Sequence, residues 1–283
     1  MNIDQKIMYG NQGFLHLPGL LDKALVGRDK QAFDTASARH YEEWKQKIAA
    51  GDASKSFYDI PDILDENDAF IELVDYEALM PVLLSAVGPD IQLNHTHARV
   101  FPPGKTFTAP WHSDLADVLG IDLAHSVNFF AKVHFYFEDL APDQGCLAFL
   151  PGTHRLPPDY PRPQIDPAGN SPAVAKIVPK AGDAVLFNTH VMHMALDNTS
   201  PKPRKSLIYA YSHFWLKNYS NAVPKNVEKY ATTRLQRQIF GLEDPNVSYF
   251  DQRYTENTNG GGSFRAASTR VFKRLLKGSS ISR

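Results

Sequence analysis

The chain has 283 residues, of which 43% are hydrophobic and 11% aromatic, enough for a sizeable core in one or two domains. Its formal net charge of −1 excludes the overall basic field expected of a protein that binds nucleic acid. A single cysteine, Cys146, excludes an intrachain disulfide framework and is typical of a reducing compartment. The first residues do not resemble a signal peptide and no apolar run reaches the ~18 residues of a membrane span, so we expect a cytoplasmic protein without integral membrane association.

The chain from about residue 20 to 88 is predicted to be helical. One helix is expected over about 29–50, ended by Gly51, and a second over about 72–87. The first helix would bury an apolar stripe at helical spacing, formed by Phe33, Ala36, Tyr41, Trp44 and Ile48. Residues 52–70 are irregular and could border a pocket.

From residue 91 the pattern changes to short aromatic and β-branched runs separated by glycine and proline turns. These runs, with an earlier strand and turn at 13–21, predict strands over 92–101, 128–137, 147–150, 175–178, 184–187 and 206–214. Many short strands of this kind indicate a sandwich or barrel. We therefore predict one domain over 1–283, mainly β, with a core at about 90–215 and the helices packed on one face. Residues 115–126 are expected to form a loop or a broken helix.

The C-terminal extension, about 216–283, is less regular. A helix is predicted over 227–240 and a flexible linker over 257–262. Residues 264–283 carry six lysines and arginines, no acid, and an apolar face at helical spacing. Such a helix can lie on a membrane surface or bind an acidic partner, or it can dock on its own domain or on another subunit of a homo-oligomer. We favour docking on the domain or a subunit.

The motif Ala109-Pro110-Trp111-His112-Ser113-Asp114 places a histidine and a carboxylate two residues apart. On an extended segment both side chains point to the same side, so His112 and Asp114 could bind one metal ion. His193 offers a third ligand, and Arg204 follows eleven residues later. Two histidines and one carboxylate form the facial arrangement of non-haem Fe(II) oxygenases. Because His190 and His193 are three residues apart, only one of them can face into a barrel from a regular strand.

Longer motifs surround these residues: Pro110-Trp111-His112-Ser113-Asp114, Pro151-Gly152-Thr153-His154, Gly182-Asp183-Ala184 and Ser200-Pro201-Lys202-Pro203-Arg204. With them the chain resembles, from about residue 10 to 215, the phytanoyl-CoA dioxygenase family of Fe(II)/2-oxoglutarate oxygenases. The resemblance implies a double-stranded β-helix, a jelly roll of cupin type. It also implies Fe(II) on His112, Asp114 and His193, 2-oxoglutarate held by Arg204, and O2 as the oxidant. The spacing of eleven residues to Arg204 in this family favours His193 over His190.

Other residues are expected to contact the cosubstrate. Ser206 shares a strand face with Arg204 and would donate a further hydrogen bond to 2-oxoglutarate. By the resemblance, His134 stands where the family tends to place an aromatic ring against 2-oxoglutarate. Alternation then turns Lys132 inward as well, to meet a carboxylate of cosubstrate or substrate; alternatively it reaches solvent from the strand end. Where the family often has a lysine this chain has Phe101. The contact to the near carboxylate of 2-oxoglutarate, the one beside the iron, is therefore assigned to Arg99 or Asn94, without a choice between them.

These observations predict an Fe(II)- and 2-oxoglutarate-dependent dioxygenase. It would hydroxylate an unactivated C–H bond of a small molecule, possibly a natural product, and release succinate and CO2. The same centre could instead desaturate, epoxidise or close a ring. The alternative of another class is a non-catalytic jelly-roll protein that binds a metal or a small acid. The complete set of two histidines, one aspartate and one arginine argues against that alternative.

Overall fold

The computed structural model describes residues 1–51, 57–104, 111–118, 128–156, 166, 169–218 and 223–242. The predicted linker at 257–262 and the basic segment at 264–283 lie outside these residues, as does most of the segment 115–126. The described start of that segment belongs to a π-helical turn, Asp114–Val118. No helix among the described residues is long and apolar enough to cross a membrane.

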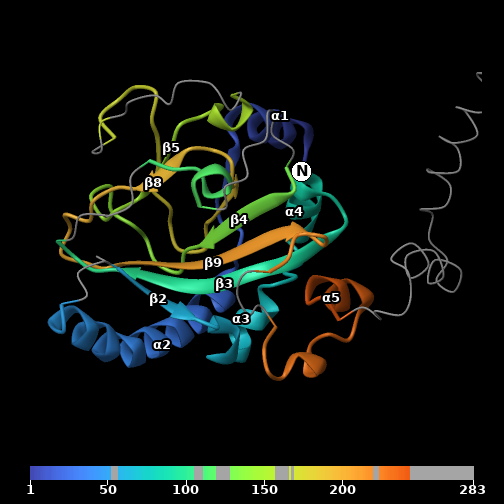
Figure 1. Cartoon of the computed structure of the whole chain (residues 1–283), viewed down its shortest axis with the longest axis horizontal. Coiled ribbons are helices and arrows are strands. Elements are labelled where there is room, and N and C mark those ends of the chain that lie inside the picture. The colour runs from blue at the N-terminus through green and yellow to red at the C-terminus, as the bar shows by residue number, and fades with distance from the viewer. Residues whose placement is uncertain are drawn as a thin grey trace, which may run out of the picture. The chain divides into compact units, whose positions relative to one another are not determined.

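Two antiparallel sheets form the centre of the described chain (Figure 1). The large sheet contains, in spatial order, β1 (Phe14–Leu17), β7 (Ala184–Asn188), β4 (Phe130–Phe135), β9 (Arg204–His213), β3 (Ile91–Phe101) and β2 (Tyr58–Pro61). The small sheet contains β6 (Ala175–Ile177), β5 (Leu147–Phe149) and β8 (His193–Ala195). The predicted β core is confirmed, and among the strands of the described residues only the short β2 and β8 were not predicted.

Strands β3 and β9 pair from Ile91 opposite His213 to Phe101 opposite Arg204 and form the longest ladder of the fold. A register shift between Leu93 and His95 marks a β-bulge. Beyond the bulge, alternate residues of both strands face the small sheet, and the others face the helices. The ladder therefore fixes which side chains of β3 and β9 enter the space between the sheets.

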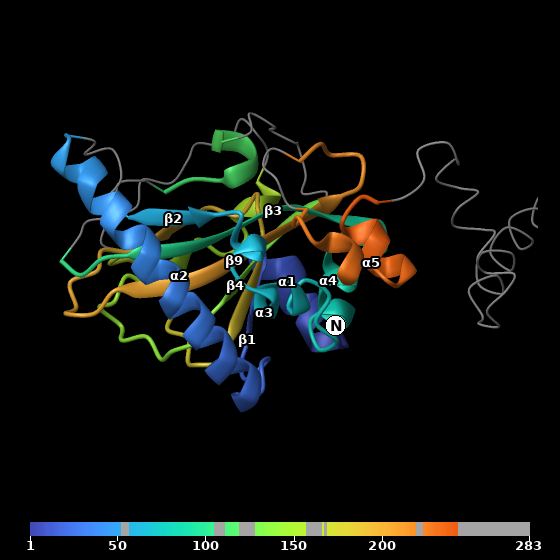
Figure 2. The ribbon, with the colours of Figure 1, turned by 90° about the horizontal axis from the view of Figure 1, so that it is seen from below.

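The helix α2 (Lys23–Ala49) lies on the opposite side of the large sheet from β5 and β8 (Figures 1 and 2). It begins earlier than predicted because the side chain of Asp22 accepts hydrogen bonds from two amides of the first turn. Phe33 and Ala36 are buried as predicted, but Tyr41 is 40% exposed. The predicted stripe is thus wrong at Tyr41, whereas Trp44 is partly buried against the core and Ile48 is also partly buried.

Two predicted helices are each divided in the structure. Residues 72–87 contain the end of α3 (Asp68–Glu72) and a separate α4 (Met80–Val87), which has a proline in its first turn. Residues 227–240 contain a 3-10 turn, Val227–Lys229, and α5 (Arg234–Ile239). Thr233 and Gln236 form a capping box at the start of α5 that the sequence analysis did not use. The same signal, Asn2 with Gln5, starts the unpredicted helix α1 (Ile3–Gln12).

The main hydrophobic core fills the layer between the large sheet and the helices. Tyr209 and Tyr211 of β9 point into this layer and are fully buried. Their hydroxyls donate to the carbonyls of Phe70 and Val74, which satisfies a polar group that would be costly to bury alone. These contacts anchor β9 to the helical layer. The opposite face of β9 can therefore present charged side chains from a fixed backbone.

Candidate active site

His112, Asp114 and His193 come together between the two sheets. Each offers one ligand atom, and these atoms all lie within 4.8 Å of one another. Nε2 of His193 is 3.5 Å from Oδ2 of Asp114, and Nε2 of His112 is 3.9 Å from Oδ1. The backbones of His112 and His193 also exchange two hydrogen bonds, of 3.1 and 2.9 Å. Backbone pairing therefore joins the two segments that carry the three side chains.

The charge states of His193 and Asp114 suit metal binding. Burial lowers the pKa of His193 to about 4, so its ring is neutral at pH 7. Its Nδ1 donates to the carbonyl of Val191 at 2.9 Å, which leaves the Nε2 lone pair directed at Asp114. Burial, the largest single effect, would raise the pKa of Asp114, but Lys132, His193 and His112 together outweigh it and hold that pKa well below its usual range. Among the described residues, Oδ2 of Asp114 is buried and accepts no hydrogen bond.

His190 is buried but lies away from this cluster. Its Nδ1 is 3.3 Å from the carbonyl of His154, and its backbone amide donates to Oδ1 of Asn188. His154 in turn contacts the carbonyl of Gly10 through Nε2 at 3.2 Å. His154 thus packs against α1 and His190 against His154, and of His190 and His193 only His193 lines the pocket described next.

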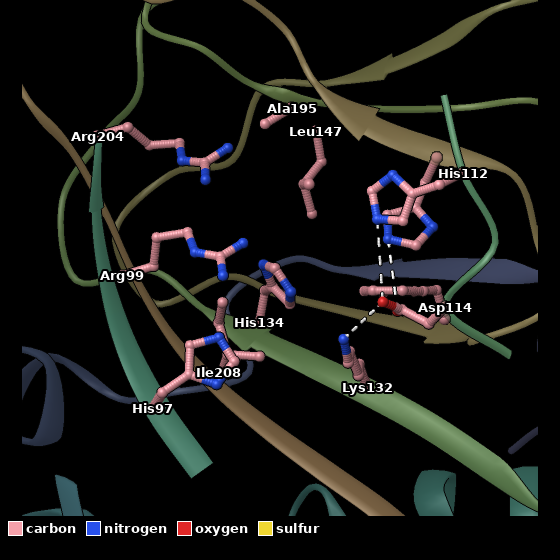
Figure 3. A pocket seen from close by; sticks show the side chains of 12 residues that line it. His97, Arg99, His112, Asp114, Lys132, His134, Leu147, Ala195, Arg204 and Ile208 are labelled. Atoms are coloured by element: carbon pink, nitrogen blue, oxygen red, sulfur yellow. Dashed lines mark ion pairs between the residues drawn. The ribbon is translucent and has the colours of Figure 1, made fainter. Parts of the chain in front are cut away.

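The three candidate metal ligands and most of the other candidate residues line one pocket (Figure 3). It is lined by His97, Arg99, His112, Asp114, Lys132, His134, Leu147, Phe187, His193, Ala195, Arg204 and Ile208. Arg204 and Arg99 enter from one end, and His112, Asp114 and Lys132 lie at the other. His134 and Leu147 lie between the two ends.

Arg204 is a buried cation without an acid beside it in the described structure. It is 1% exposed, its Nη1 donates to the carbonyl of Gly145 at 2.7 Å, and its Nε has no partner among the described residues. Gly145 has a φ of 70°, and a Cβ there would lie 2.9 Å from the ring of Phe101, so glycine is needed for this approach. A buried guanidinium without an acid implies an anionic ligand.

Three further polar atoms around Arg204 lack hydrogen-bond partners in the described part of the chain. They are Nδ1 of His134, Oγ of Ser206 and the hydroxyl of Tyr136. Ser206 lies two residues from Arg204 on the same strand face, as expected, although it does not line the pocket itself. Unsatisfied buried polar atoms are rare in native proteins and often mark a missing ligand. This group fits an acid with several oxygen atoms.

Of the two residues considered for a second carboxylate contact, only Arg99 lines the pocket. Its Nε and Nη2 donate to both oxygens of Asp59, at 2.7 and 2.8 Å, from the neighbouring strand β2. Asn94 lies at the bulge of β3, donates to Oγ of Ser212 at 3.2 Å and does not line the pocket. The bulge turns Asn94 out of the alternation that brings Arg99 inward.

Lys132 points inward, and its Nζ lies 2.9 Å from Oδ1 of Asp114. Of the two alternatives, the structure therefore shows the inward one. His97 and Asp59 were not among the site residues predicted from the sequence. His97 stands two residues before Arg99, so strand alternation could have placed it in the pocket wall.

A profile of the family described as "Phytanoyl-CoA dioxygenase (PhyH)" matches residues 9–206. L-proline trans-4-hydroxylase of Streptomyces griseoviridis is 21% identical over 238 residues, covering 74% of this chain and 86% of the relative. Peroxisomal phytanoyl-CoA dioxygenase of Homo sapiens is 22% identical over 279 residues, covering 86% of this chain and 78% of the relative.

Solved structures agree in fold. HygX from Streptomyces hygroscopicus, with nickel and 2-oxoglutarate bound, has a TM-score of 0.58 at 15% identity, over 81% of this chain and 93% of that chain. The non-haem alpha ketoglutarate dependent carbocyclase SnoK, from nogalamycin biosynthesis, has a TM-score of 0.60 at 18% identity, over 76% and 85%. These likenesses show the predicted double-stranded β-helix.

Proposed function

The chain belongs to the phytanoyl-CoA dioxygenase family of iron- and 2-oxoglutarate-dependent enzymes, and we propose that it hydroxylates an unactivated C–H bond of a small molecule. Succinate and CO2 are the expected co-products. One observation carries the proposal: a cluster of His112, Asp114 and His193 shares a pocket with the buried, acid-free Arg204. Arg204 and the cluster lie at opposite ends of the pocket, which would give it an iron end and a carboxylate end.

His112, Asp114 and His193 would hold Fe(II) and leave its opposite face open. The donor set fits the ion, since Asp114 offers a buried Oδ2 without a hydrogen bond and His193 offers a neutral ring. Iron and 2-oxoglutarate, once bound, supply the activation of O2 that oxidises the substrate. The carbonyl of Val191 fixes the ring orientation of His193 throughout.

Arg204 would bind the far carboxylate of 2-oxoglutarate. Its planar guanidinium presents paired donors to a carboxylate, and burial makes such a pair stronger than it is in water. Oγ of Ser206 is the nearest additional donor on the same strand face, and the ring of His134 would form the wall beside the carbon chain. The carbonyl of Gly145 holds the guanidinium in its direction before the acid arrives.

The substrate does not follow from the relatives, because their names differ. They include a hydroxylase of L-proline, a dioxygenase of phytanoyl-CoA and an ectoine dioxygenase. The solved structures include a carbocyclase and an epimerase, so desaturation, epoxidation and ring formation remain alternative outcomes at the same centre. A non-catalytic binding role has no support in these comparisons, since the family and the named relatives are enzymes.

Anaerobic addition of Fe(II) and 2-oxoglutarate is expected to give the weak visible charge-transfer band of the iron–oxo-acid chelate. The measurement is a difference spectrum on the folded protein, with Fe(II) alone and 2-oxoglutarate alone as blanks. Zn(II) in place of Fe(II) is the matched control, because its filled d shell gives no such band. A folded protein that shows no band with Fe(II) would contradict the proposed function.

Arg204→Lys is expected to keep iron but to weaken 2-oxoglutarate by about 1–3 kcal/mol, the size of a charged hydrogen bond, or roughly five- to 150-fold. Lysine keeps the charge and loses the paired donors. The midpoint of the chelate band against 2-oxoglutarate concentration measures the change. Arg237→Lys on the surface helix α5 is the matched control. An unchanged midpoint for Arg204→Lys would mean that another residue holds the far carboxylate.

A further inference from the structure

The pocket contains more fixed positive charge than the proposed iron and 2-oxoglutarate site uses. Burial, followed by the positive charge of neighbouring cations, holds the pKa of His134 well below its usual value, and burial lowers that of His97 to about 4. Both rings are therefore neutral at pH 7. The positive charge of the pocket wall lies on three side chains, Arg99, Lys132 and Arg204.

Two of these three cations have assigned partners. Arg99 is paired with both oxygens of Asp59, so together they contribute no net charge. Arg204 has the far carboxylate of 2-oxoglutarate in the proposed function. Lys132 contacts Oδ1 of Asp114, whose charge the iron ion would also use.

Counting the charges of the described residues in the loaded site leaves Lys132 in excess. The two positive charges of Fe(II) and that of Arg204 balance the two carboxylates of 2-oxoglutarate and that of Asp114. Lys132 then adds one positive charge, in a side chain that is only 13% exposed. An ammonium group in this position is costly unless an anion accompanies it.

Lys132 lies at the iron end of the pocket, away from Arg204 (Figure 3). In the sheet register Lys132 is opposite Ala210 of β9. Arg204 stands six residues before Ala210 on that strand, so the backbones of Arg204 and Ala210 are about 20 Å apart at the spacing of extended chain. Lys132 is also closer than His134 to Phe130, where β4 begins. An anion at Lys132 therefore lies beside the iron ligands and not at the Arg204 end.

We propose that the substrate is a small carboxylic acid whose carboxylate is bound by Lys132. This inference rests on the proposed iron and 2-oxoglutarate site. Because Nζ of Lys132 is 2.9 Å from Asp114, a carboxylate on Lys132 would place the carbons nearest to it beside the iron. The oxidised carbon is thus expected within a few bonds of the carboxylate. Neutral molecules without an acidic group would leave Lys132 uncompensated.

The test compares acids with their own amides. The probes are the straight-chain acids from butanoate to octanoate and the proteinogenic L-amino acids, each paired with its primary amide. Each probe is titrated anaerobically into wild-type protein that is saturated with Fe(II) and 2-oxoglutarate, and the change in the chelate band is followed. At least one acid is expected to perturb the band at about tenfold lower concentration than its amide, the size of one charge-assisted hydrogen bond.

Three variants assign the preference to Lys132. Lys132→Met is expected to form the chelate but to respond equally to acid and amide, whereas Lys132→Arg keeps the preference for the acid. Lys205→Met is the matched control, since Lys205 leaves β9 on the outer face and pairs with Asp34 at 2.6 Å. It should behave as the wild type does.

Two results would overturn the inference. The first is a wild-type chelate to which no acid binds better than its amide. The second is a Lys132→Met protein that keeps the acid preference and instead loses affinity for iron or 2-oxoglutarate, which would make Lys132 a positioning residue for Asp114 or a cosubstrate contact. The acid–amide comparison uses the wild type, so it decides the matter even where a variant fails to fold. Absence of the chelate band in the wild type would overturn the proposed function itself, and this inference with it.

Discussion

His193→Ala is expected to abolish tight iron binding and all succinate formation, while His190→Ala keeps both. Of these two side chains only that of His193 reaches Asp114, at 3.5 Å, and two ligands alone do not form the three-residue facial site. Both residues are buried histidines, so the two variants remove similar volumes. Anaerobic Fe(II) titration at protein concentrations well above the dissociation constant measures the stoichiometry directly.

His190→Ala is therefore the control for packing loss, and thermal unfolding of both variants shows how much stability each loses. If the protein keeps one equivalent of iron after His193→Ala but loses it after His190→Ala, then His190 and not His193 is the iron ligand. The register of β8 opposite β5 would then be incorrect, because that register aligns His193 with Phe149. The assignment of Arg204 would have to be reopened as well.

Asp114→Ala is expected to lower iron affinity by more than about a hundredfold and to stop turnover. Changes around metal ligands alone cost about 10–100-fold, so loss of the one anionic ligand should cost more. It also leaves the ammonium of Lys132 without its acid, which should lower the free energy of unfolding. Iron titration and succinate release measure the first effect, and urea unfolding measures the second.

Asp117→Asn is the matched control, since Asp117 lies in the same π-helical turn and accepts a hydrogen bond from the amide of Ser113 at 2.7 Å. It is a carboxylate of the same segment that does not line the pocket. Turnover at the wild-type rate in Asp114→Ala would remove Asp114 from the iron.

The parts of the fold that were predictable depend on patterns local in sequence. β3, β4 and β9 carry alternating or aromatic runs that mark them as strands. By contrast, β2 is an edge strand of four residues that pairs only with β3, about forty residues away, so nothing within its own segment identifies it. The division of the predicted helices depends on the proline in the first turn of α4 and on the cap at Thr233, which a periodicity analysis ignores.

In the candidate site, too, the predictable features were those with a local sequence pattern. His112 and Asp114 could be chosen because their spacing is local, and His193 because its distance to Arg204 fits the family. The pairing of Arg99 with Asp59 was not predictable, because it depends on β2 lying beside β3. Asn94 was an alternative to Arg99 for the carboxylate of 2-oxoglutarate nearer the iron, and the bulge at that position turns it away from the pocket. Sequence patterns therefore located the candidate ligands, and the packing between strands determined their neighbours.

The backbone bridge between His112 and His193 affects how the enzyme acquires its metal. Two backbone hydrogen bonds join the segments on which the ligands stand. Little chain entropy then remains to be lost when iron arrives, in contrast to small zinc modules whose folding waits for the metal. Synthesis and loading can occur at different times, and a chelator would inactivate the enzyme without denaturing it. Iron supply can thus control activity reversibly while the amount of folded protein stays constant.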